Sequence, residues 1–526
     1  MMDKLYMPDL SNGTYQNPIL FCDYSDPDVI RVGDTYYMTA SSFNYVPGLP
    51  LLVSKDLVNW ELVNYALENI PEEDYVRPRH ADGVWAPAIR WHEGYFYIYY
   101  GMPDEGIYMV RAKDALRRWE TPVMVMPGKG LIDPCPFWDE DGCAYVVHGY
   151  ARSRIGFNSW LGIFAISREG TRAIGDDHLL FDGTKAHPTI EGPKMYKRNG
   201  WYYIFAPAGG VAEGWQTVLR SRNILGPYED RIVLRQGQSK VNGPHQGAWV
   251  NTPQGEDWFI HFQSRGLYGR ITHLQPMKWC ENEWPVIGCP VTGESWGEPV
   301  DAFTKPKGVS SAQYSLQASD DFRGALGLQW QFMGNHCEGF YRLSDGKLRL
   351  YAVRQPDDSG LLWNCPNVLT QKLVCPAFTA EISVDASGLQ SGEQAGLGLI
   401  GGQYAYTALR RSDEGFKLIY VQSEGEHHAE RILTAINADM DQITFRMTLL
   451  PDGYDTAVVH FEYSCGGGFV QIGTPFCPER HTWVGARIAL FAMPVIGQTN
   501  GGYANFSALK VSTYIDKLLA AETDSL

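Results

Sequence analysis

The 526-residue chain has no run of about 18 consecutive apolar residues, the length that a membrane-spanning helix requires. Its first residues, Met-Met-Asp-Lys-Leu-Tyr, lack the apolar segment of a secretory signal peptide. The ten cysteines include no close Cys-x-x-Cys pair, so neither a zinc knuckle nor a redox motif is indicated. From these absences we expect a soluble protein with no membrane partner, located in the cytoplasm with its thiols reduced.

Basic residues are also few, with 44 Lys and Arg against 60 Asp and Glu and a formal net charge of −16. A nucleic-acid-binding surface needs clustered basic side chains to displace phosphate counterions, so DNA and RNA are not expected partners. Apolar and aromatic residues, by contrast, are abundant at 44% and 13% of the chain. This composition is sufficient for the cores of two or three domains.

A pattern that recurs five times in the first half of the chain predicts the fold. Each copy starts with a small polar or charged residue, usually beside a proline, and continues through a glycine to a run of aromatic and β-branched residues. Repeats of about 45 to 60 residues with several short strands each are typical of a radial array of β-sheets. Five copies therefore predict a five-bladed β-propeller over residues 14–300. The copies start at Asp26-Pro27, Trp85-Ala86-Pro87, Asp133-Pro134, Glu191-Gly192-Pro193 and His245-Gln246-Gly247.

The second part of the chain has a different pattern. Residues 301–315 carry Lys, Gly, Ser and Pro without periodicity, which predicts a linker. Beyond it, residues 378–385 alternate between apolar and polar, as a half-buried strand does. We therefore expect an all-β chain in which a two-sheet β-sandwich over residues 313–514 follows the propeller, and a short helix and tail over residues 515–526. Hairpin turns are predicted at Ser344-Asp345-Gly346-Lys347 and Asp413-Glu414-Gly415.

Three of the five repeat leaders are carboxylic acids, namely Asp26, Asp133 and Glu191. The innermost strand of each propeller blade runs along the central channel, so the leading residues are expected to meet at the axis. Each acid taken singly is typical of an ordinary turn, but their common register in separate blades predicts one cluster. Three acids without a matching set of His or Cys suit glycoside hydrolysis, which needs one neutral carboxyl and one ionised carboxylate.

His245 also leads a repeat and is expected to face the axis. It would bind a calcium ion, directly or through water, or hydrogen-bond an acid, or else be a neutral histidine satisfied by the backbone. Phe43, Tyr45 and Trp85 lie in loops or at strand starts beside the expected pocket, where their rings would stack on a sugar. His427-His428 is expected to form a solvated hairpin rather than a metal site.

At these residues the chain resembles glycoside hydrolase family 43, the inverting β-xylosidases, α-L-arabinofuranosidases and arabinanases, many of which append a concanavalin-like β-sandwich. The resemblance implies that Asp26 is the general base, Asp133 the modulator that tunes and orients the acid, and Glu191 the general acid. No cofactor is required. The residues that it places around the terminal sugar are Phe43, Trp85, His245 and Arg270. The matching segments are Asn17-Pro18-Ile19-Leu20, Asp26-Pro27, Arg31 to Tyr37, Ser41-Ser42-Phe43, Pro47-Gly48, Ser54 to Trp60, Trp85-Ala86-Pro87, Ile132-Asp133-Pro134, Glu191-Gly192-Pro193 and Gly269-Arg270.

The resemblance further implies an exo-acting enzyme that releases terminal xylosyl or arabinofuranosyl units from xylo- or arabino-oligosaccharides of hemicellulose. Family members commonly read Trp-Ala-Pro-Asp where this chain has Ala88, which leaves the choice of sugar open. A sandwich packed against the propeller would limit the pocket to one sugar. Whether the chain forms a homo-oligomer does not follow from the sequence.

Two alternative functions fit the sequence less well. Five-bladed hydrolases of fructosides are retaining enzymes, which usually have Arg where Ile132 stands and Cys where Gly192 stands. A propeller that only binds sugar would keep the aromatic residues but would not need three acids. The presence of all three carboxylates favours catalysis.

Overall fold

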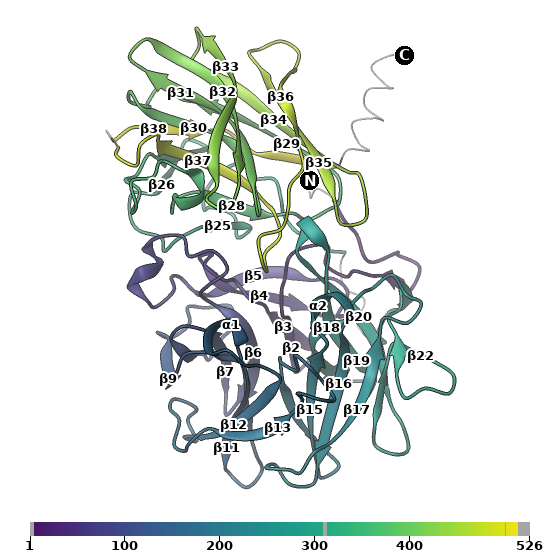
Figure 1. The fold of residues 1–526 in the computed structure, drawn as a ribbon. Helices are drawn as coiled ribbons and strands as arrows, with labels where there is room; N and C mark the ends of the chain where they lie inside the picture. Colours follow the sequence, from purple (N-terminus) through teal and green to yellow (C-terminus); the bar gives the residue numbers. More distant parts are fainter. Residues whose placement is uncertain (1–4, 309–312, 500, 514–526) are drawn as a thin grey trace.

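The computed structural model describes residues 5–308, 313–499 and 501–513 of the chain. Figure 1 shows two bodies, a propeller formed by the first part of the chain, in purple to teal, and a sandwich formed by the second part, in green to yellow, which packs on one face of the propeller. The fold class is therefore all-β, as predicted. The helix and tail expected over residues 515–526 lie outside the described residues.

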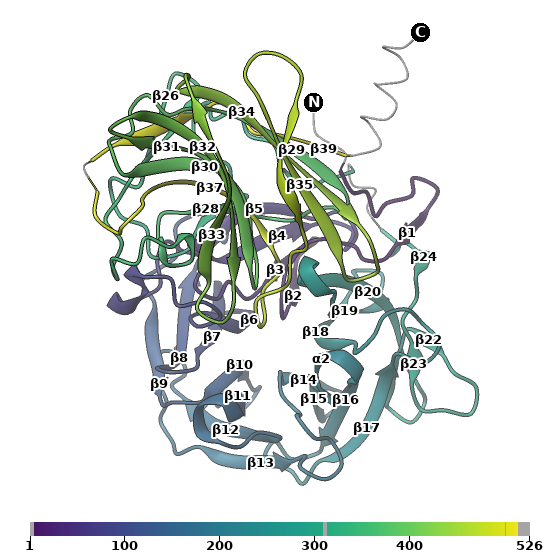
Figure 2. The same ribbon diagram turned by 45° about the horizontal axis from the view of Figure 1, so that its top comes forward.

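Five sheets, each with four antiparallel strands, form a ring around a central axis, and the first strand of each lies nearest this axis (Figure 2). This arrangement confirms the five-bladed propeller. Blade 1 is β2 (Asp28–Val32), β3 (Thr35–Thr39), β4 (Gly48–Ser54) and β5 (Glu61–Leu67). Blade 2 is β6 (Trp85–His92), β7 (Tyr95–Met102), β8 (Gly106–Ala112) and β9 (Val123–Pro127). Blade 3 is β10 (Leu131–Trp138), β11 (Ala144–Tyr150), β12 (Trp160–Ile166) and β13 (His178–Asp182).

The last two blades complete the ring. Blade 4 is β14 (Lys194–Arg198), β15 (Trp201–Ala208), β16 (Trp215–Ser221) and β17 (Glu229–Arg235), extended by β22 (Cys289–Pro290) and β23 (Gly297–Glu298). Blade 5 is β18 (His245–Asn251), β19 (Asp257–Ser264), β20 (Arg270–Trp279) and β21 (Pro285–Ile287). Short helices lie between strands: η1 (Glu73–Val76), α1 (Arg152–Ile155), α2 (Gly210–Glu213) and η2 (Gly266–Tyr268).

The aromatic runs of the repeats form the second strand of each blade and pack between neighbouring sheets. In β15, for example, Phe205 is fully buried and its ring lies 5.9 Å from that of Phe259 in β19. Burial of such large apolar side chains stabilises each blade against the next by about 1.5 to 3 kcal/mol per side chain. The repeat in the sequence is thus a repeat of inter-blade packing.

The expected linker over residues 301–315 is in part a strand. β24 (Ala302–Thr304) pairs antiparallel with β1 (Thr14–Gln16), so that Thr14 lies opposite Thr304. No local periodicity indicates this pair, because its partner strand is almost 300 residues away in the sequence. The pair holds the two ends of the propeller segment together.

The second body consists of two antiparallel sheets packed face to face, as the sandwich prediction requires. Residues 344–347 form the predicted hairpin, in which Asp345 and Gly346 have φ of 54° and 69°, the left-handed values of a type I′ turn. One sheet has the order β25 (Trp330–Phe332), β28 (Leu369–Lys372), β37 (Arg487–Pro494), β30 (Glu393–Ile400), β31 (Tyr404–Ser412), β32 (Gly415–Glu424), β33 (Ala429–Ala438). The other has the order β26 (Tyr341–Ser344), β27 (Lys347–Tyr351), β38 (Tyr503–Phe506), β29 (Phe378–Asp385), β34 (Gln442–Pro451), β35 (Ala457–Ser464), β36 (Val470–Phe476), and β39 (Lys510–Thr513) also pairs with β29.

Buried contacts join the two bodies. Asp23 of the propeller accepts hydrogen bonds from the backbone N–H of Arg270 at 2.8 Å and of Gly485, in the sandwich loop between β36 and β37, at 2.9 Å. Trp363, in η3 (Leu362–Asn364), stacks between His80 of the propeller at 3.6 Å and His428 at 3.7 Å. The prediction of a solvated His427-His428 hairpin is therefore wrong for His428, since its ring faces this interface.

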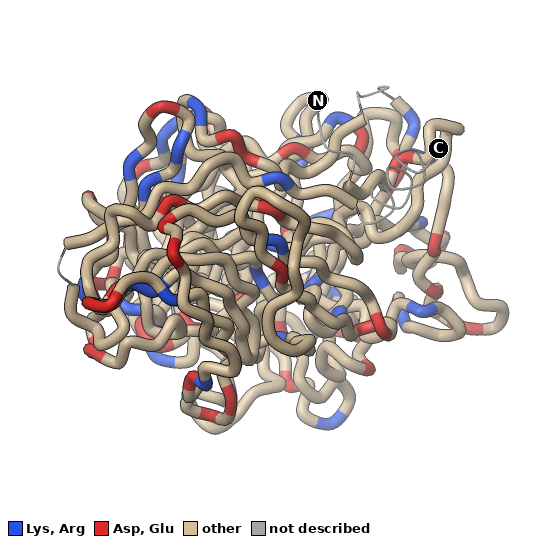
Figure 3. The backbone as a smooth tube through the Cα atoms, turned by 90° about the horizontal axis from the view of Figure 1, so that it is seen from above, with Lys and Arg blue, Asp and Glu red and all other residues tan. Residues whose placement is uncertain are grey.

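Charged residues of both signs are interspersed along the backbone rather than separated into regions of one sign (Figure 3). All ten cysteines are free, and Cys22, Cys135, Cys365 and Cys375 are buried. No helix within the described ranges has the length and apolar character needed to span a membrane. The cytoplasmic location stays a prediction.

Candidate active site

The backbone at the start of each blade has an unusual conformation. A residue with positive φ stands directly before the Pro or Gly of each repeat: Asp26 (56°), Ala86 (34°), Asp133 (57°), Gly192 (57°) and Gln246 (33°). Asp26 and Asp133 occupy this left-handed position themselves, whereas Glu191 precedes it. The expectation of one shared position is therefore wrong: the acids come from two neighbouring positions. Left-handed backbone is costly for residues other than glycine, and such strain is common at functional sites.

Asp26 is 5% exposed, and both of its oxygens accept hydrogen bonds. Arg270 Nη1 donates to Oδ1 at 2.8 Å, while the hydroxyls of Ser25 and Ser41 donate to Oδ2 at 2.7 and 2.6 Å. Ser41 in turn accepts the backbone N–H of Ala86 at 2.7 Å, which ties blade 1 to blade 2. Three donors and no acceptor surround Asp26, an arrangement that suits an ionised carboxylate.

Asp133 is the most enclosed of the three acids. It is 4% exposed, and its Oδ2 accepts the backbone N–H of Gly192 at 2.8 Å. Burial, with the charges of Glu191 and Asp26 beside it, raises the pKa of Asp133 to about 8. A Cβ at Gly149 would lie 3.6 Å from Asp133 Oδ2 and 3.8 Å from Glu191 Cα, so this glycine lies against both acids. The Asp133 carboxyl therefore holds a proton at neutral pH.

Glu191 differs from the other two in access. Its side chain is 31% exposed, and Oε1 lies 2.8 Å from Nε2 of His245, which is itself 1% exposed. The predicted hydrogen bond between His245 and an acid is therefore present. Of the three carboxyls, Glu191 is the one that a ligand entering the channel meets first.

The described side chains around His245 form no calcium site by themselves. Nε2 of His245 is used by Glu191, and Nδ1 is buried without a partner. Within the described ranges, no group of three or more His, Cys, Asp or Glu is placed to hold a metal ion. Calcium prefers six to eight oxygen ligands, so an ion here would depend on water. A calcium ion held through water at His245 stays a prediction.

Beneath the acids lies a second layer of buried polar groups. Asp28 Oδ2 accepts from Arg90 Nη1 at 2.7 Å, and Arg90 Nη2 lies 2.9 Å from Cys135 Sγ. Lys194, also fully buried, donates to the carbonyl of Pro87 at 3.1 Å. Ala88 packs in the apolar cluster that contains Cys135, with no exposed surface. The departure from Trp-Ala-Pro-Asp thus changes the interior of the blade and adds no group at the mouth of the channel.

Aromatic side chains of both bodies meet at the rim. The Trp85 ring, held by an Nε1–H···O bond of 2.8 Å to Ala81, lies 6.2 Å edge-to-face from the ring of Trp483, in the loop between β36 and β37. The guanidinium carbon of Arg270 lies 5.5 Å from the Trp483 ring and 4.6 Å from that of Phe262. The sandwich therefore contributes a wall of the site, beside the residue that binds Asp26.

The other two predicted aromatic residues are more deeply buried. Phe43 is 3% exposed, belongs to the same apolar cluster as Trp85 and Trp483, and has a left-handed φ of 53°. Tyr45 is 5% exposed, and the guanidinium of Arg487 covers its ring at 3.5 Å. Tyr45 thus lies in the interface between the two bodies, and this packing gives no support to a sugar contact.

Sequence reasoning missed three residues that shape the site. Ser25 and Ser41 were not predicted as site residues. Ser25 stands directly before Asp26-Pro27, and Ser41 belongs to Ser41-Ser42-Phe43. Their common hydroxyl chemistry beside an expected carboxylate is the signal that could have found them. Trp483 gives no such signal, because it reaches the site only through the packing of the two bodies.

A five-bladed propeller with three carboxyls at its axis, of different burial and with different partners, defines the class of glycoside hydrolases. The family models support this and make it specific. Residues 15–285 match the model of glycosyl hydrolases family 43, and residues 319–512 match the β-xylosidase C-terminal concanavalin A-like domain. The chain belongs to glycosyl hydrolases family 43.

Individual proteins of known name are similar over long stretches. A putative β-xylosidase of Xylanibacter ruminicola is 45% identical over 368 residues, 70% of this chain and 67% of that protein. A non-reducing end α-L-arabinofuranosidase of Bacteroides ovatus is 30% identical over 413 residues, 74% of each chain. Among solved structures, a family 43 protein from Bacillus licheniformis superposes with a TM-score of 0.81 at 25% identity, covering 95% of this chain and all (100%) of that one.

Proposed function

We propose that this protein is an inverting, exo-acting hydrolase that releases terminal xylosyl or arabinofuranosyl units from oligosaccharides of plant hemicellulose. The observation that carries the proposal is that three neighbouring carboxyls have different surroundings. Glu191 is partly exposed and contacts His245, Asp133 is buried and has a raised pKa, and Asp26 accepts hydrogen bonds from three donors. The names of the similar proteins, β-xylosidase and α-L-arabinofuranosidase, support the choice of sugars.

In this proposal each acid has its own role. Asp26, fixed by Arg270 and two hydroxyls, takes a proton from the attacking water. Glu191, the accessible carboxyl, gives a proton to the leaving oxygen, and His245 positions it. Asp133 is the modulator: its Oδ2 accepts the backbone N–H of Gly192, the residue after Glu191, and so it orients the acid.

The rim supports an exo mode of action. Trp85 from the propeller and Trp483 from the sandwich stand on the same edge of the channel and narrow it. Asp28, Arg90 and Lys194, on the first strands of blades 1, 2 and 4, add a layer of largely buried charged groups. A site that is walled on one side holds the end of a chain better than its middle.

Proton NMR of the first sugar released tests the mechanism. An inverting enzyme needs room for water between base and acid, with carboxyl groups roughly 6.5 to 9.5 Å apart, and gives the anomer opposite to the bond cleaved. We expect that anomer before mutarotation. A product of retained configuration would exclude the base role of Asp26 and favour the retaining, fructoside-type alternative, and early release of long oligosaccharides would exclude the exo mode.

Two further assays complete the assignment. Nitrophenyl β-D-xylopyranoside and nitrophenyl α-L-arabinofuranoside, compared at equal concentration, show which terminal sugar is preferred. If the protein hydrolyses neither substrate, a propeller that only binds sugar is favoured. Metal analysis and exhaustive chelation test calcium. Unchanged activity and melting temperature in metal-free protein would leave His245 as the partner of Glu191 alone.

A further inference from the structure

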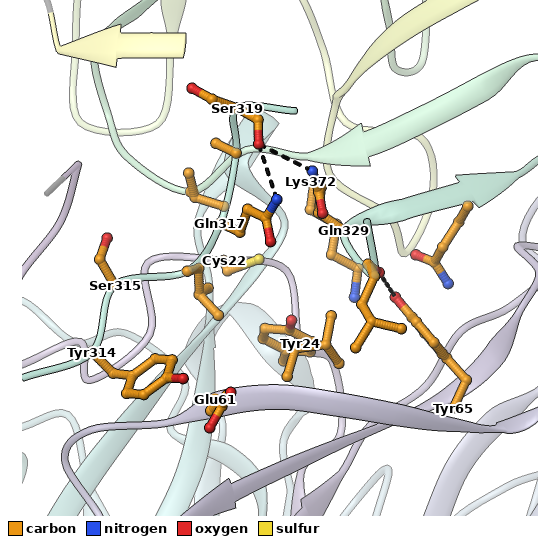
Figure 4. Close-up of a pocket in the computed structure, with 16 residues that line it drawn as sticks. Cys22, Tyr24, Glu61, Tyr65, Tyr314, Ser315, Gln317, Ser319, Gln329 and Lys372 are labelled. Carbon is orange, nitrogen blue, oxygen red and sulfur yellow. Dashed lines mark hydrogen bonds between the residues drawn. The ribbon is translucent and has the colours of Figure 1, made fainter. Parts of the chain in front are cut away.

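A cavity of about 510 Å³ lies between the propeller and the sandwich, apart from the catalytic channel. Figure 4 shows its two sides: Glu61 and Tyr65 project from a propeller strand, and Gln329 and Lys372 face them from the other body. The remaining lining residues include Cys22, Tyr24, Tyr314, Gln317 and Gln331.

The segment that carries Asp26 separates this cavity from the active site. Within residues 22–26, Cys22 and Tyr24 line the cavity, whereas Ser25 and Asp26 bind Arg270. A ligand in the cavity would therefore contact the back of this segment and could not reach the acids.

Lys372, the last residue of β28, is an unpaired buried cation in this cavity. Lys372 is 8% exposed. Among the described residues, no carboxylate lies within ion-pair distance of its ammonium group, and no acceptor forms a hydrogen bond with it. Its Nζ lies 4.1 Å from the centre of the Tyr24 ring, which covers one side of the charge. A buried ammonium without an anion is costly, so this arrangement favours a negatively charged partner.

The surrounding charges do not supply that partner. Burial lowers the pKa of Lys372 to about 8, with Arg487 lowering it further and Cys22 and Asp23 opposing this. The Cys22 thiol stays neutral because burial raises its pKa to about 12. Asp23 uses its two oxygens on the backbone N–H groups of Arg270 and Gly485. Glu61 lies instead beside Tyr314, where burial and this carboxylate raise the pKa of the phenol to about 12.

We propose that this cavity binds a small organic carboxylate of about monosaccharide size, whose carboxylate pairs with Lys372. The volume is several times that needed for a carboxylate group alone. Among the lining glutamines, Gln331 is engaged by Pro47 and Arg487, whereas Gln317 uses only its amide nitrogen in a described hydrogen bond, so its amide oxygen can accept one from a hydroxyl group of the ligand. Hydroxylated acids and simple acids both carry the carboxylate that Lys372 requires. The affinities of glucuronate and acetate distinguish these two kinds of ligand.

Isothermal titration calorimetry of the full chain tests the proposal with D-glucuronate, acetate and D-glucuronamide, a neutral analogue of glucuronate. We expect a carboxylate to bind and the amide to bind at least about tenfold more weakly. Tighter binding of glucuronate than of acetate would identify a hydroxylated acid, and the reverse order a simple one. Binding of neither carboxylate, or equal binding of glucuronate and glucuronamide, would overturn the proposal.

Proton uptake locates the binding group. At pH 8 roughly half of Lys372 is neutral, and a bound carboxylate would raise its pKa, so titrations in buffers of different ionisation enthalpy should show roughly half a proton taken up per ligand. Lys372→Met, which keeps an unbranched side chain one atom shorter and without charge, should remove both the uptake and the preference for the carboxylate. Lys417→Met, a surface change of equal charge in β32, should keep both. Carboxylate binding that persists unchanged in Lys372→Met would contradict the proposal. If this variant does not fold, the comparison of glucuronate with glucuronamide on the wild-type protein still tests it.

Discussion

The propeller and the sandwich bury polar groups for different purposes. At the propeller axis, Asp26 and Asp133 are buried side by side on left-handed backbone, next to a histidine with an unpartnered ring nitrogen. In the sandwich, Glu393 is 1% exposed but fully engaged, accepting from Gln390 N, Gly502 N and the Thr499 hydroxyl. The first arrangement keeps charge poised for reaction, and the second uses a charge to hold loops together.

The backbone differs in the same way. Left-handed residues other than glycine stand at the start of propeller strands, at Asp26 and Asp133, where their side chains meet at the channel. In the sandwich such residues stand in turns, at Asp345 and His428. Strain at the propeller axis therefore positions chemistry, whereas in hairpin turns of the propeller, as at Glu93 and Asn199, and in the sandwich it reverses the chain. The comparison teaches that removing a buried acid should cost activity in one body and stability in the other.

The largest expected effect comes from removing the acid that activates water. Asp26→Ala should lower kcat by roughly 10³- to 10⁴-fold on every substrate because the base is lost, and the chain should still fold although Arg270, Ser25 and Ser41 lose their acceptor. Steady-state kinetics and the melting temperature measure the two effects. Asp34→Ala, an exposed acid of the same blade with a side chain 71% exposed, is the matched control and should keep full activity.

The opposite result is expected in the sandwich. Glu393→Ala leaves the backbone N–H groups of Gln390 and Gly502 without their acceptor, while the Thr499 hydroxyl keeps the carbonyl of Ala352. The substitution should therefore destabilise the sandwich by about 2 to 3 kcal/mol while kcat per folded molecule stays unchanged. Chemical denaturation and active-site-normalised kinetics check this pair. Loss of kcat in folded Glu393→Ala, or unfolding of Asp26→Ala, would break the contrast between the two bodies.

Removal of the exposed acid should have an effect that depends on the leaving group. Glu191→Ala should lower kcat/KM by roughly 10²- to 10³-fold for xylo-oligosaccharides but far less for activated aryl glycosides, which need little protonation. A series of aryl glycosides with leaving groups of different pKa measures this dependence. Equal losses for Asp26→Ala and Glu191→Ala on an activated aryl glycoside would show that base and acid are wrongly assigned.

The sandwich also takes part in the active site, because it contributes Trp483 to the rim. Trp483→Ala should lower kcat/KM by about tenfold, mainly through KM, because a wall of the pocket is removed while the acids stay in place. Trp483→Phe, which keeps an aromatic face, should recover most of this loss. Unchanged KM in Trp483→Ala would confine the sandwich to a stabilising role.

Repeats and alternation made most of the fold predictable. The five aromatic runs mark the blades because each buries its rings against the next sheet, and residues 378–385 alternate because one face of β29 is buried: Ala380, Ile382 and Val384 are at most 1% exposed. The pair of β1 and β24 was not predictable, because its two strands carry no period of their own and meet only once the ring closes.

The site was predictable in its residues but not in its details. Asp26, Asp133 and Glu191 were identified from the repeat, and the structure brings Asp133 against Gly192 and Glu191 against His245. That the acids come from two adjacent positions depends on local φ values, which the sequence does not state. Trp483 and the cavity around Lys372 arise from the docking of two bodies, which leaves no local pattern in either.

The smallest expected effect concerns stability and its dependence on pH. The carboxyl of Asp133 ionises near its ordinary pKa of 3.8 in the unfolded chain and, because of burial and the neighbouring acids, near 8 in the folded one. Between these values the folded protein holds a proton that the unfolded chain has released, so this residue makes stability fall as pH rises, and above pH 8 it adds no further slope. Asp133→Asn cannot titrate. Its melting temperature relative to wild type should therefore rise between pH 4 and pH 8, on the order of a few degrees, and then level off. Asp133→Ala should show the same slope with a constant offset from the lost hydrogen bond to Gly192. If the melting temperatures of wild type and both variants change in parallel with pH, Asp133 is ionised throughout. The acids at the propeller axis would then serve as Glu393 does in the sandwich, as charges that hold the structure together.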